Sequence, residues 1–261
     1  MPASSHGLCR MIDIHSHILP GLDDGSRDLE ESVGMLRMAA ASGTTDIVAT
    51  PHANPDYAFD PVLVERKIAE LQAAVGEAPR IHYGCEMHLT PENIENAIGS
   101  HGSYSINHRG YLLVEFSDLL IPKTADQMFA RMMRAGIRPI VVHPERNPLM
   151  RDRLPELEAW MAQGVLFQIT AQSFMGRYGK SARTMAHELM SHGLAHFVAS
   201  DAHDLKHRTA PMDEPRQYVE MTFGAEAALR VFEENPRSAL SGVPLIALPF
   251  PVRAKRWFSW W

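Results

Sequence analysis

Short β-branched runs alternate with longer segments of helical period along almost the whole chain from Met11 onward. This is the βα pattern of a parallel sheet, because consecutive parallel strands need a crossover connection, usually a helix. Seven strands are predicted, at residues 12–15, 46–50, 80–86, 111–116, 138–143, 165–170 and 195–200. Seven βα units within roughly 235 residues favour a closed or nearly closed α/β barrel, since such barrels run to about 250 residues. An open doubly wound sheet is the alternative.

Helix signals lie between these runs. The predicted helices cover residues 29–41, 62–75, 125–135, 156–162, 182–191 and 225–234. Ser26 or Asp28 can cap the first helix, and Gly43 lies just past its end. The last helix is expected to end at Asn235-Pro236, since proline cannot continue a regular helix.

No internal repeat or linker divides the chain, so we assign residues 11–243 to one domain. Residues 1–10 are interpreted as an extension before a second possible start at Met11. Residues 244–261 form a tail that combines tryptophans with basic residues. Such a tail can pack on the domain or on a neighbouring subunit, and contact with a membrane surface or a partner is the alternative.

Composition excludes several classes of protein. With 45% hydrophobic residues, the 261-residue chain can bury a full core. Its net charge of −6 argues against binding duplex nucleic acid mainly by neutralising phosphates. No stretch approaches the roughly 20 apolar residues of a membrane helix. The two cysteines, Cys9 and Cys85, form no disulfide framework and indicate a reducing compartment, so a cytoplasmic location is expected.

Side chains of metal-ligand type collect where the predicted strands end, which is where parallel α/β proteins place their active sites. One loop carboxylate joins them, which gives five histidines and four carboxylates: His15, His17, Asp24, His52, Glu86, Glu115, His143, Asp201 and His203. Each alone could be a structural histidine or a helix cap, but their convergence on one rim favours a metal site. Nine ligands imply two or three divalent ions, and imidazole with carboxylate but no thiolate suits manganese, iron or zinc.

The net charge of such a site indicates which kind of molecule it would bind. Three divalent ions against four carboxylates leave roughly two positive charges, which match a phosphate dianion. Arg146 and Arg208 follow strand ends, and the guanidinium fork suits phosphate oxygens. A surface ion pair is the alternative for each arginine alone. Beside a metal rim, phosphate binding is the better interpretation.

These motifs resemble those of the polymerase-and-histidinol-phosphatase (PHP) superfamily, and within it the bacterial manganese-dependent protein-tyrosine phosphatases of the CpsB/CapC/YwqE type. The most specific features of this resemblance are the Asp-Asp-Gly at 23–25, which follows the His-x-His at 15–17, and the His-Pro-Glu-Arg at 143–146. The matching segments are residues 11–25 (Met-Ile-Asp-Ile-His-Ser-His-Ile-Leu-Pro-Gly-Leu-Asp-Asp-Gly), 49–52, 83–86, 113–116, 142–146 and 199–203. The resemblance implies a single-domain, distorted (β/α)7 TIM-like barrel that holds three metal ions, Mn²⁺ first among them.

The resemblance also implies the ligands of each ion. One ion would be held by His15, His17, Glu86 and Asp201, a second by Glu86, Glu115 and His143, and a third by Asp24, His52 and His203. Glu86 would bridge the first two ions. Arg146 and Arg208 would be the catalytic residues that hold the phosphate.

The implied reaction is hydrolysis of phosphotyrosine by a metal-bound hydroxide. The implied partner is the tyrosine-rich tail of a bacterial tyrosine kinase in capsule or exopolysaccharide biosynthesis. No phosphocysteine is expected, because the Cys-x5-Arg signature is absent: His15 and Pro91 stand six residues after Cys9 and Cys85. The alternatives are a small-molecule phosphomonoesterase acting on histidinol phosphate or a nucleotide, a domain of exonuclease type, and a metal-binding regulatory module without catalysis.

Overall fold

The computed structural model describes residues 10–77, 79–100 and 102–245. The predicted extension and tail therefore lie almost entirely outside the described residues. Their assignment stays a prediction.

Every predicted strand run contains a β-strand. The strands are β1 (Met11–Ser16), β2 (Thr44–Ala49), β3 (His52–Ala53), β4 (Arg80–Tyr83), β5 (Glu86–His88), β6 (Tyr111–Glu115), β7 (Arg138–Val142), β8 (Leu166–Thr170) and β9 (Phe197–Ala199). The run at 80–86, predicted as one strand, is broken at Gly84-Cys85. The strand predicted at 46–50 ends at Ala49, and a short strand, β3, follows after a break at Thr50-Pro51. Backbone packs closely at the first break, where a Cβ on Gly84 would lie 2.7 Å from a methyl group of Val48.

Helices follow the strands in chain order. They are α1 (Leu29–Ala41), α2 (Pro61–Val75), α3 (Pro91–Gly99), α4 (Ala125–Arg134), α5 (Leu154–Gln163), α6 (Ala171–Phe174), α7 (Gly179–Ser191), α8 (Asp213–Phe223), α9 (Ala225–Leu229) and α10 (Asn235–Ser241), with a 3-10 turn η1 (Ile106–His108). Asp28 caps α1, since its carboxylate accepts the N–H of Glu31 at 2.9 Å. The sequence did not predict α3, α6, α8 or α10.

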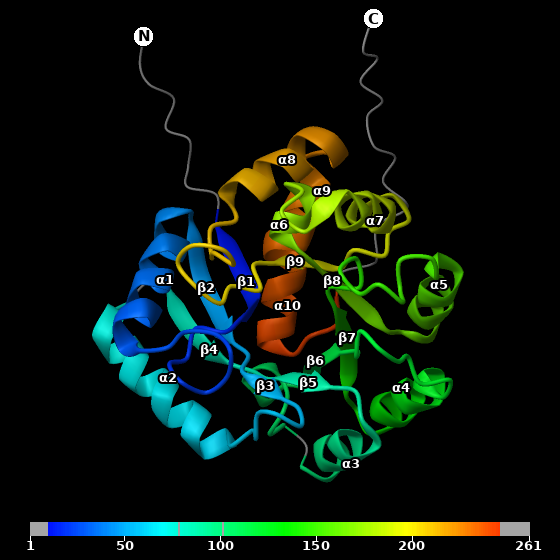
Figure 1. The fold of residues 1–261 in the computed structure, drawn as a ribbon, viewed down its shortest axis with the longest axis horizontal. Helices are drawn as coiled ribbons and strands as arrows, with labels where there is room; N and C mark the ends of the chain where they lie inside the picture. The colour runs from blue at the N-terminus through cyan, green and yellow to red at the C-terminus, as the bar shows by residue number, and fades with distance from the viewer. Residues whose placement is uncertain (1–9, 78, 101, 246–261) are drawn as a thin grey trace, which may run out of the picture.

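All strand pairs in the described part of the chain are parallel. The orders are β1-β2-β4 and β3-β5-β6-β7-β8-β9, and the chain of β2 and of β4 continues across each break into β3 and β5. Beyond β9 the backbone returns to β1: Asp201 N–H donates to His15 O at 2.9 Å, and His17 N–H donates to Ala202 O at 2.8 Å. Figure 1 shows the helices arranged around these strands. The architecture is an α/β fold of parallel sheets.

One apolar cluster lies on the inner side of the strands. It unites side chains of β1, β2, β6, β7, β8 and β9 with Ala239 of α10. Two further clusters pack the outer faces of the strands against the helices. The inner cluster contains only apolar side chains. The predicted ligands lie beyond it, at the carboxyl ends of the strands.

The predicted helix end at Asn235-Pro236 is wrong. A π-helical turn, η2 (Arg230–Glu234), follows α9 and leads directly into α10. Pro236 cannot donate to the preceding turn and its ring would clash with a carbonyl there, and a widened turn relieves both problems. The chain thus passes through the proline, and α10 reaches the inner cluster.

His196 is a buried histidine directly before β9, 1% exposed, and its Nδ1 lies 3.1 Å from the backbone nitrogen of Phe167 and 2.9 Å from the backbone oxygen of Leu194. Burial lowers its pKa to about 4. Between pH 6.5, the ordinary pKa of histidine, and pH 4, His196 is protonated in the unfolded chain but stays neutral in the folded chain. The free energy of unfolding should therefore fall as pH drops from 6.5 to 4, by about 3 kcal/mol in total from this group.

Denaturant unfolding across this pH range checks the prediction. His196→Gln should lose this part of the pH dependence, although it can lower stability at neutral pH. His192→Gln, at an exposed histidine paired with Glu158, makes the same replacement outside the core and serves as its control. Equal slopes for wild type and His196→Gln would contradict the assignment.

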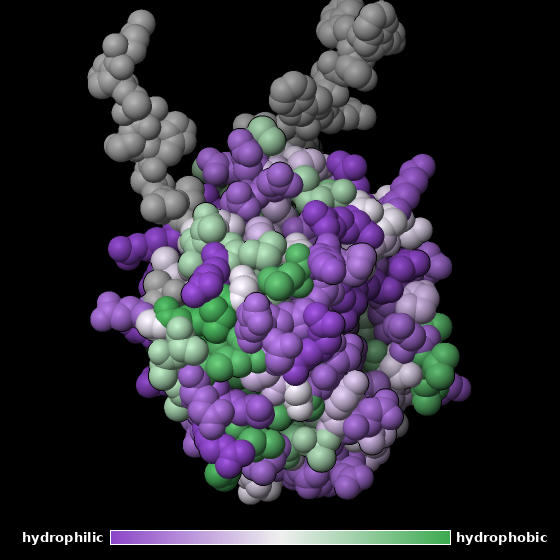
Figure 2. Space-filling model, turned by 60° about the vertical axis from the view of Figure 1, so that its left-hand side comes forward, coloured by the Kyte–Doolittle hydropathy of each residue, from purple (hydrophilic) through white to green (hydrophobic). Residues whose placement is uncertain are grey.

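One face of the molecule is mainly hydrophilic (Figure 2). Figure 2 shows one face on which hydrophobic residues form small patches between hydrophilic ones. No helix in the described ranges has the length and apolar character needed to cross a membrane.

Candidate metal centre

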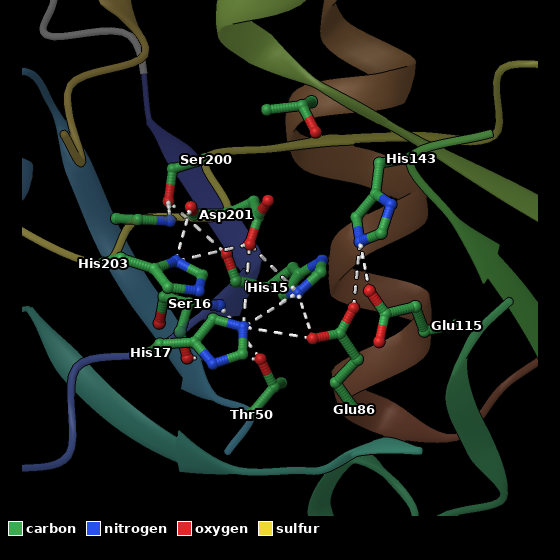
Figure 3. Close-up of polar contacts among 12 residues, drawn as sticks. His15, Ser16, His17, Thr50, Glu86, Glu115, His143, Ser200, Asp201 and His203 are labelled. Carbon is green, nitrogen blue, oxygen red and sulfur yellow. Dashed lines mark hydrogen bonds and ion pairs between the residues drawn. The ribbon is translucent and has the colours of Figure 1, made fainter. Parts of the chain in front are cut away.

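The structure brings the nine predicted ligands together at the carboxyl ends of the strands. His15 lies in β1, His52 in β3, Glu86 in β5 and Glu115 in β6, and the remaining five lie in loops that follow strands: His17, Asp24, His143, Asp201 and His203. In Figure 3, His15, His17, Glu86 and Asp201 lie at the middle and point toward one another, with Glu115, His143 and His203 around them. Residues far apart in the sequence thus form one cluster.

Four ligand atoms define the first part of the cluster. The Nε2 atoms of His15 and His17 lie 3.3 Å apart. Glu86 Oε2 lies 3.3 Å from His15 Nε2 and 3.2 Å from His17 Nε2, and Asp201 Oδ1 lies 3.4 and 3.6 Å from the same two atoms. Ligands bound about 2.1 Å from one ion in a tetrahedral arrangement lie about 3.4 Å apart. The mutual distances of the His15, His17 and Glu86 atoms therefore fit a single transition-metal ion, and Asp201 faces the two histidines of this group.

Two residues that the sequence analysis missed orient these histidines. His15 Nδ1–H donates to Gln168 Oε1 at 3.0 Å, and His17 Nδ1–H donates to Asp23 Oδ2 at 2.7 Å. Both Nε2 lone pairs are thereby directed into the cluster, as in metal sites where an outer group fixes the imidazole. Gln168 had a signal, as the polar residue within the apolar run Leu-Phe-Gln-Ile of β8. Asp23 stands beside the chosen Asp24.

The second part of the cluster joins Glu86 and Glu115 to His143 and His52. His143 Nε2 lies 3.0 Å from Glu86 Oε1 and 3.8 Å from Glu115 Oε1. His52 Nδ1 lies 3.0 Å from Glu86 Oε2 and 3.9 Å from Glu115 Oε2. Glu86 therefore faces both parts of the cluster.

The third part contains Asp24, His52 and His203. Asp24 Oδ1 lies 3.3 Å from His52 Nε2 and 3.5 Å from His203 Nε2. His203 Nδ1–H donates to the backbone oxygen of Asp201 at 3.0 Å, which leaves Nε2 to face Asp24. The ring of His17 also belongs to this group of ligand atoms. His52 faces carboxylates with both ring nitrogens, and so lies between the second and third parts.

Unpaired buried atoms test whether these residues fit divalent ions. Glu86 Oε2, Asp201 Oδ1, His52 Nδ1 and His203 Nε2 are buried and make no hydrogen bond. A buried polar atom without a partner is costly, and all four face the cluster. The donor set and its unpaired atoms fit divalent ions bound by imidazole and carboxylate.

The electrostatics of the cluster keep its central carboxylates ionised. Burial alone would raise the pKa of Glu86, but the surrounding imidazoles, His15 first, hold that pKa well below its usual value. Burial opposes ionisation of Asp201 too, and Arg208 and His15 nevertheless keep its pKa well below the usual range. Ionised carboxylates are the form that binds metal, so the site is prepared for cations.

Both predicted phosphate-binding arginines meet the cluster at Asp201. Arg208 Nη2 donates to Asp201 Oδ2 at 2.6 Å, and Arg146 Nη1 donates to the same oxygen. The other oxygen of Asp201 faces the histidines. The Nε of Arg208 is buried without a partner. The two guanidinium groups thus lie together beside the candidate ligands. The Nε–H of Arg208 is free to donate to a further acceptor.

Backbone geometry at the site departs from the ordinary. His143 and Asp201 have φ values of +35° and +53°, in the left-handed region that costs free energy for residues other than glycine. In the Asp-Asp-Gly segment, a Cβ on Gly25 would lie only 2.2 Å from His17 O, so that position requires glycine. Two residues with left-handed backbone and one glycine that no other residue could replace thus lie among or beside the candidate ligands.

Cys85 is the only cysteine among the described residues, and it cannot serve as a nucleophile. Its side chain is 0% exposed and packs in one of the clusters between strands and helices. Burial raises the pKa of its thiol well above the ordinary value, which disfavours the reactive thiolate.

Comparison with known proteins agrees with this geometry. The family described as "Capsular polysaccharide synthesis, CpsB/CapC" matches residues 11–241. Tyrosine-protein phosphatase YwqE of Bacillus subtilis is 34% identical over 95% of this chain and 99% of its own. Putative tyrosine-protein phosphatase CapC of Staphylococcus aureus is 37% identical, over 76% of this chain and 79% of its own.

A solved structure is also similar. It comes from the crystal structures of YwqE from Bacillus subtilis and CpsB from Streptococcus pneumoniae, which are described as unique metal-dependent tyrosine phosphatases. It superposes with a TM-score of 0.85 at 32% identity and covers 93% of this chain and all of the other.

Fold and cluster together define the class: an α/β protein with a candidate metal centre at the carboxyl ends of its parallel strands. Within that class, the chain belongs to the CpsB/CapC family.

Proposed function

We propose that this chain is a metal-dependent protein-tyrosine phosphatase. The observation that carries the proposal is Asp201, which faces the histidine cluster with one oxygen and binds Arg146 and Arg208 with the other. That arrangement places two phosphate-binding groups directly beside the candidate metal ligands. Its relatives YwqE and CpsB, named as tyrosine phosphatases, support the substrate class.

We propose three divalent ions, Mn²⁺ first, with iron or zinc as the alternatives. Three groups of ligand atoms, each within 4.8 Å of one another, support this number. The three groups are His15, His17 and Glu86, then His52, Glu86 and Glu115, then His17, Asp24, His52 and His203. We propose the ligand sets implied by the resemblance, in which Asp201 completes the first group and His143 the second. Bound there, the ions would lower the pKa of a water molecule and neutralise phosphoryl charge.

The residues of the chain bind and orient the phosphoryl group. Hydrolysis joins a water oxygen to phosphorus and breaks the bond from phosphorus to the tyrosine oxygen. That oxygen leaves with the bonding electrons and regains a proton, which yields tyrosine and phosphate. Arg146 and Arg208 would donate N–H groups to the phosphoryl oxygens and stabilise their charge during the transfer. Buried Cys85 supports direct transfer to water without a phosphocysteine.

The finer fold assignment belongs to the same proposal. We propose that the strands close into a distorted (β/α)7 barrel. The hydrogen bonds between β1 and the segment after β9, and the apolar cluster inside the strands, support closure. The breaks in the second and third strand runs would be its distortion.

The proposed partner is the phosphorylated, tyrosine-rich tail of a bacterial tyrosine kinase that controls capsule or exopolysaccharide export. The capsule-synthesis family to which the chain belongs supports this choice. The cytoplasmic location that the cysteines indicate stays a prediction.

A panel of substrates tests the proposed function. Hydrolysis of a phosphotyrosine peptide, histidinol phosphate and para-nitrophenyl phosphate is measured with the Mn²⁺-loaded protein. We expect the phosphotyrosine peptide to have the highest kcat/KM. Preference for histidinol phosphate would contradict the tyrosine assignment and favour a small-molecule phosphatase. Metal binding without any hydrolysis would favour the regulatory module.

A further inference from the structure

Tyr178 lies beside Arg146 and Arg208, and the sequence analysis assigned it no role. The Cζ of Arg146 is 4.4 Å from the centroid of the Tyr178 ring, a cation–π contact. Burial keeps the pKa of the Tyr178 hydroxyl above its usual value, although Arg208 also lies near enough to lower that pKa. The Tyr178 side chain is half-buried and comes from the loop between α6 and α7. Tyr178 therefore contacts Arg146 and lies near Arg208, the two groups proposed to hold the phosphate.

The loop that carries Tyr178 has a defined shape. Gly176 and Gly179 flank the tyrosine with φ values of +78° and +87°, a backbone that favours glycine. Gly179 N–H donates to Gly176 O at 3.0 Å, which closes the turn around Tyr178. The preceding helix α6 is fixed by Ser173, whose hydroxyl donates to buried Glu145 at 2.7 Å. The ring is thus held against Arg146 by the fold.

Arg146 is constrained from two directions. Its Nη1 binds Asp201 and lies 3.4 Å from Thr170 Oγ1, while the Tyr178 ring lies over its guanidinium. Hydrogen bonds on one nitrogen alone leave the plane of the guanidinium free to turn, and a ring over the face opposes that rotation. A fixed plane is what a bidentate contact with phosphate oxygens requires.

We propose that Tyr178 is a positioning residue that holds Arg146 and Arg208 in the orientation that binds a phosphoryl group. This inference rests on the proposed function, since it assumes that the two arginines bind phosphate. Tyr178 acts through the arginines, so its loss should weaken every phosphate ligand to a similar degree and leave the metal ligands intact.

Binding of inorganic phosphate to the Mn²⁺-loaded protein tests this, measured by calorimetry together with metal content and with KM and kcat for para-nitrophenyl phosphate. Tyr178→Leu removes the ring and should weaken phosphate binding about 5- to 30-fold, the range of one cation–π contact. KM should rise, and metal content should stay at the wild-type value. Tyr178→Phe keeps the ring and should restore phosphate binding to within about threefold of wild type.

Tyr218→Leu is the matched control. Tyr218 makes the same kind of contact with Arg183, at 5.4 Å, on helices α7 and α8. This variant should bind phosphate like the wild type.

Three outcomes would overturn the inference. Tyr178→Leu could bind phosphate as tightly as wild type, or Tyr178→Phe could lose as much as Tyr178→Leu, or metal could be lost together with phosphate. A wild-type protein that binds no phosphate would overturn both this inference and the proposed function. Equal binding by wild type and Tyr178→Leu would overturn the inference alone.

Discussion

Glu86→Gln should lower phosphatase activity by at least about 100-fold, because replacing even a residue that only supports a metal ligand costs about 10- to 100-fold. Glu86 is 1% exposed and lies within 3.3 Å of His15, His17, His52 and His143. Glutamine keeps the shape of the Glu86 side chain. It removes the negative charge that faces the histidines of the first and second parts of the cluster. Bound metal, measured by elemental analysis, should fall along with activity.

Asp46→Asn is the control for Glu86. Asp46 also pairs with a histidine, His82, at 2.9 Å, but near the amino end of β2. Its amide variant should keep both metal and activity. Full metal content and full activity in Glu86→Gln would show that Glu86 does not bridge the ions.

Arg146→Ala should lower kcat about 100- to 1,000-fold, the usual cost of removing one preorganised group that stabilises transition-state charge. Metal content should stay near that of the wild type, because Arg208 still holds Asp201 Oδ2 and the histidines still face Asp201 Oδ1. Steady-state kinetics and elemental analysis of the same preparation check both parts.

Two further variants refine the Arg146 result. Arg146→Lys keeps the positive charge but lacks the planar guanidinium that can bind two oxygens at once. It should therefore recover only part of the activity that Arg146→Ala loses. Arg153→Ala removes an exposed arginine that pairs with Glu156 and should have no effect. Loss of metal in Arg146→Ala would instead make Arg146 a structural partner of Asp201.

Much of the fold follows from local sequence signals. The seven strand runs are rich in β-branched residues, and α1 has both a cap and an acidic first turn, so their positions could be predicted. Helix α6 has only four residues, too few for a periodic pattern. The passage of the last helix through Pro236 depends on packing against the inner cluster, which no local rule encodes.

The candidate site divides in the same way. The convergence of the nine candidate ligands could be predicted because the carboxyl ends of parallel strands meet at one edge, whatever their separation in sequence. Asp23 and Gln168 could not, since their role depends on which ring nitrogen each histidine presents. The contact between Arg146 and Tyr178 joins two loops, and neither motif contains a signal for it.

Metal dependence of phosphotyrosine hydrolysis tests the central claim most directly. The purified chain is stripped with a chelator, dialysed, and assayed on a phosphotyrosine peptide while Mn²⁺ is added back in measured equivalents. We expect no activity from the stripped chain and full recovery as the sites fill, near three ions per chain. Full turnover by the metal-free chain would contradict the account.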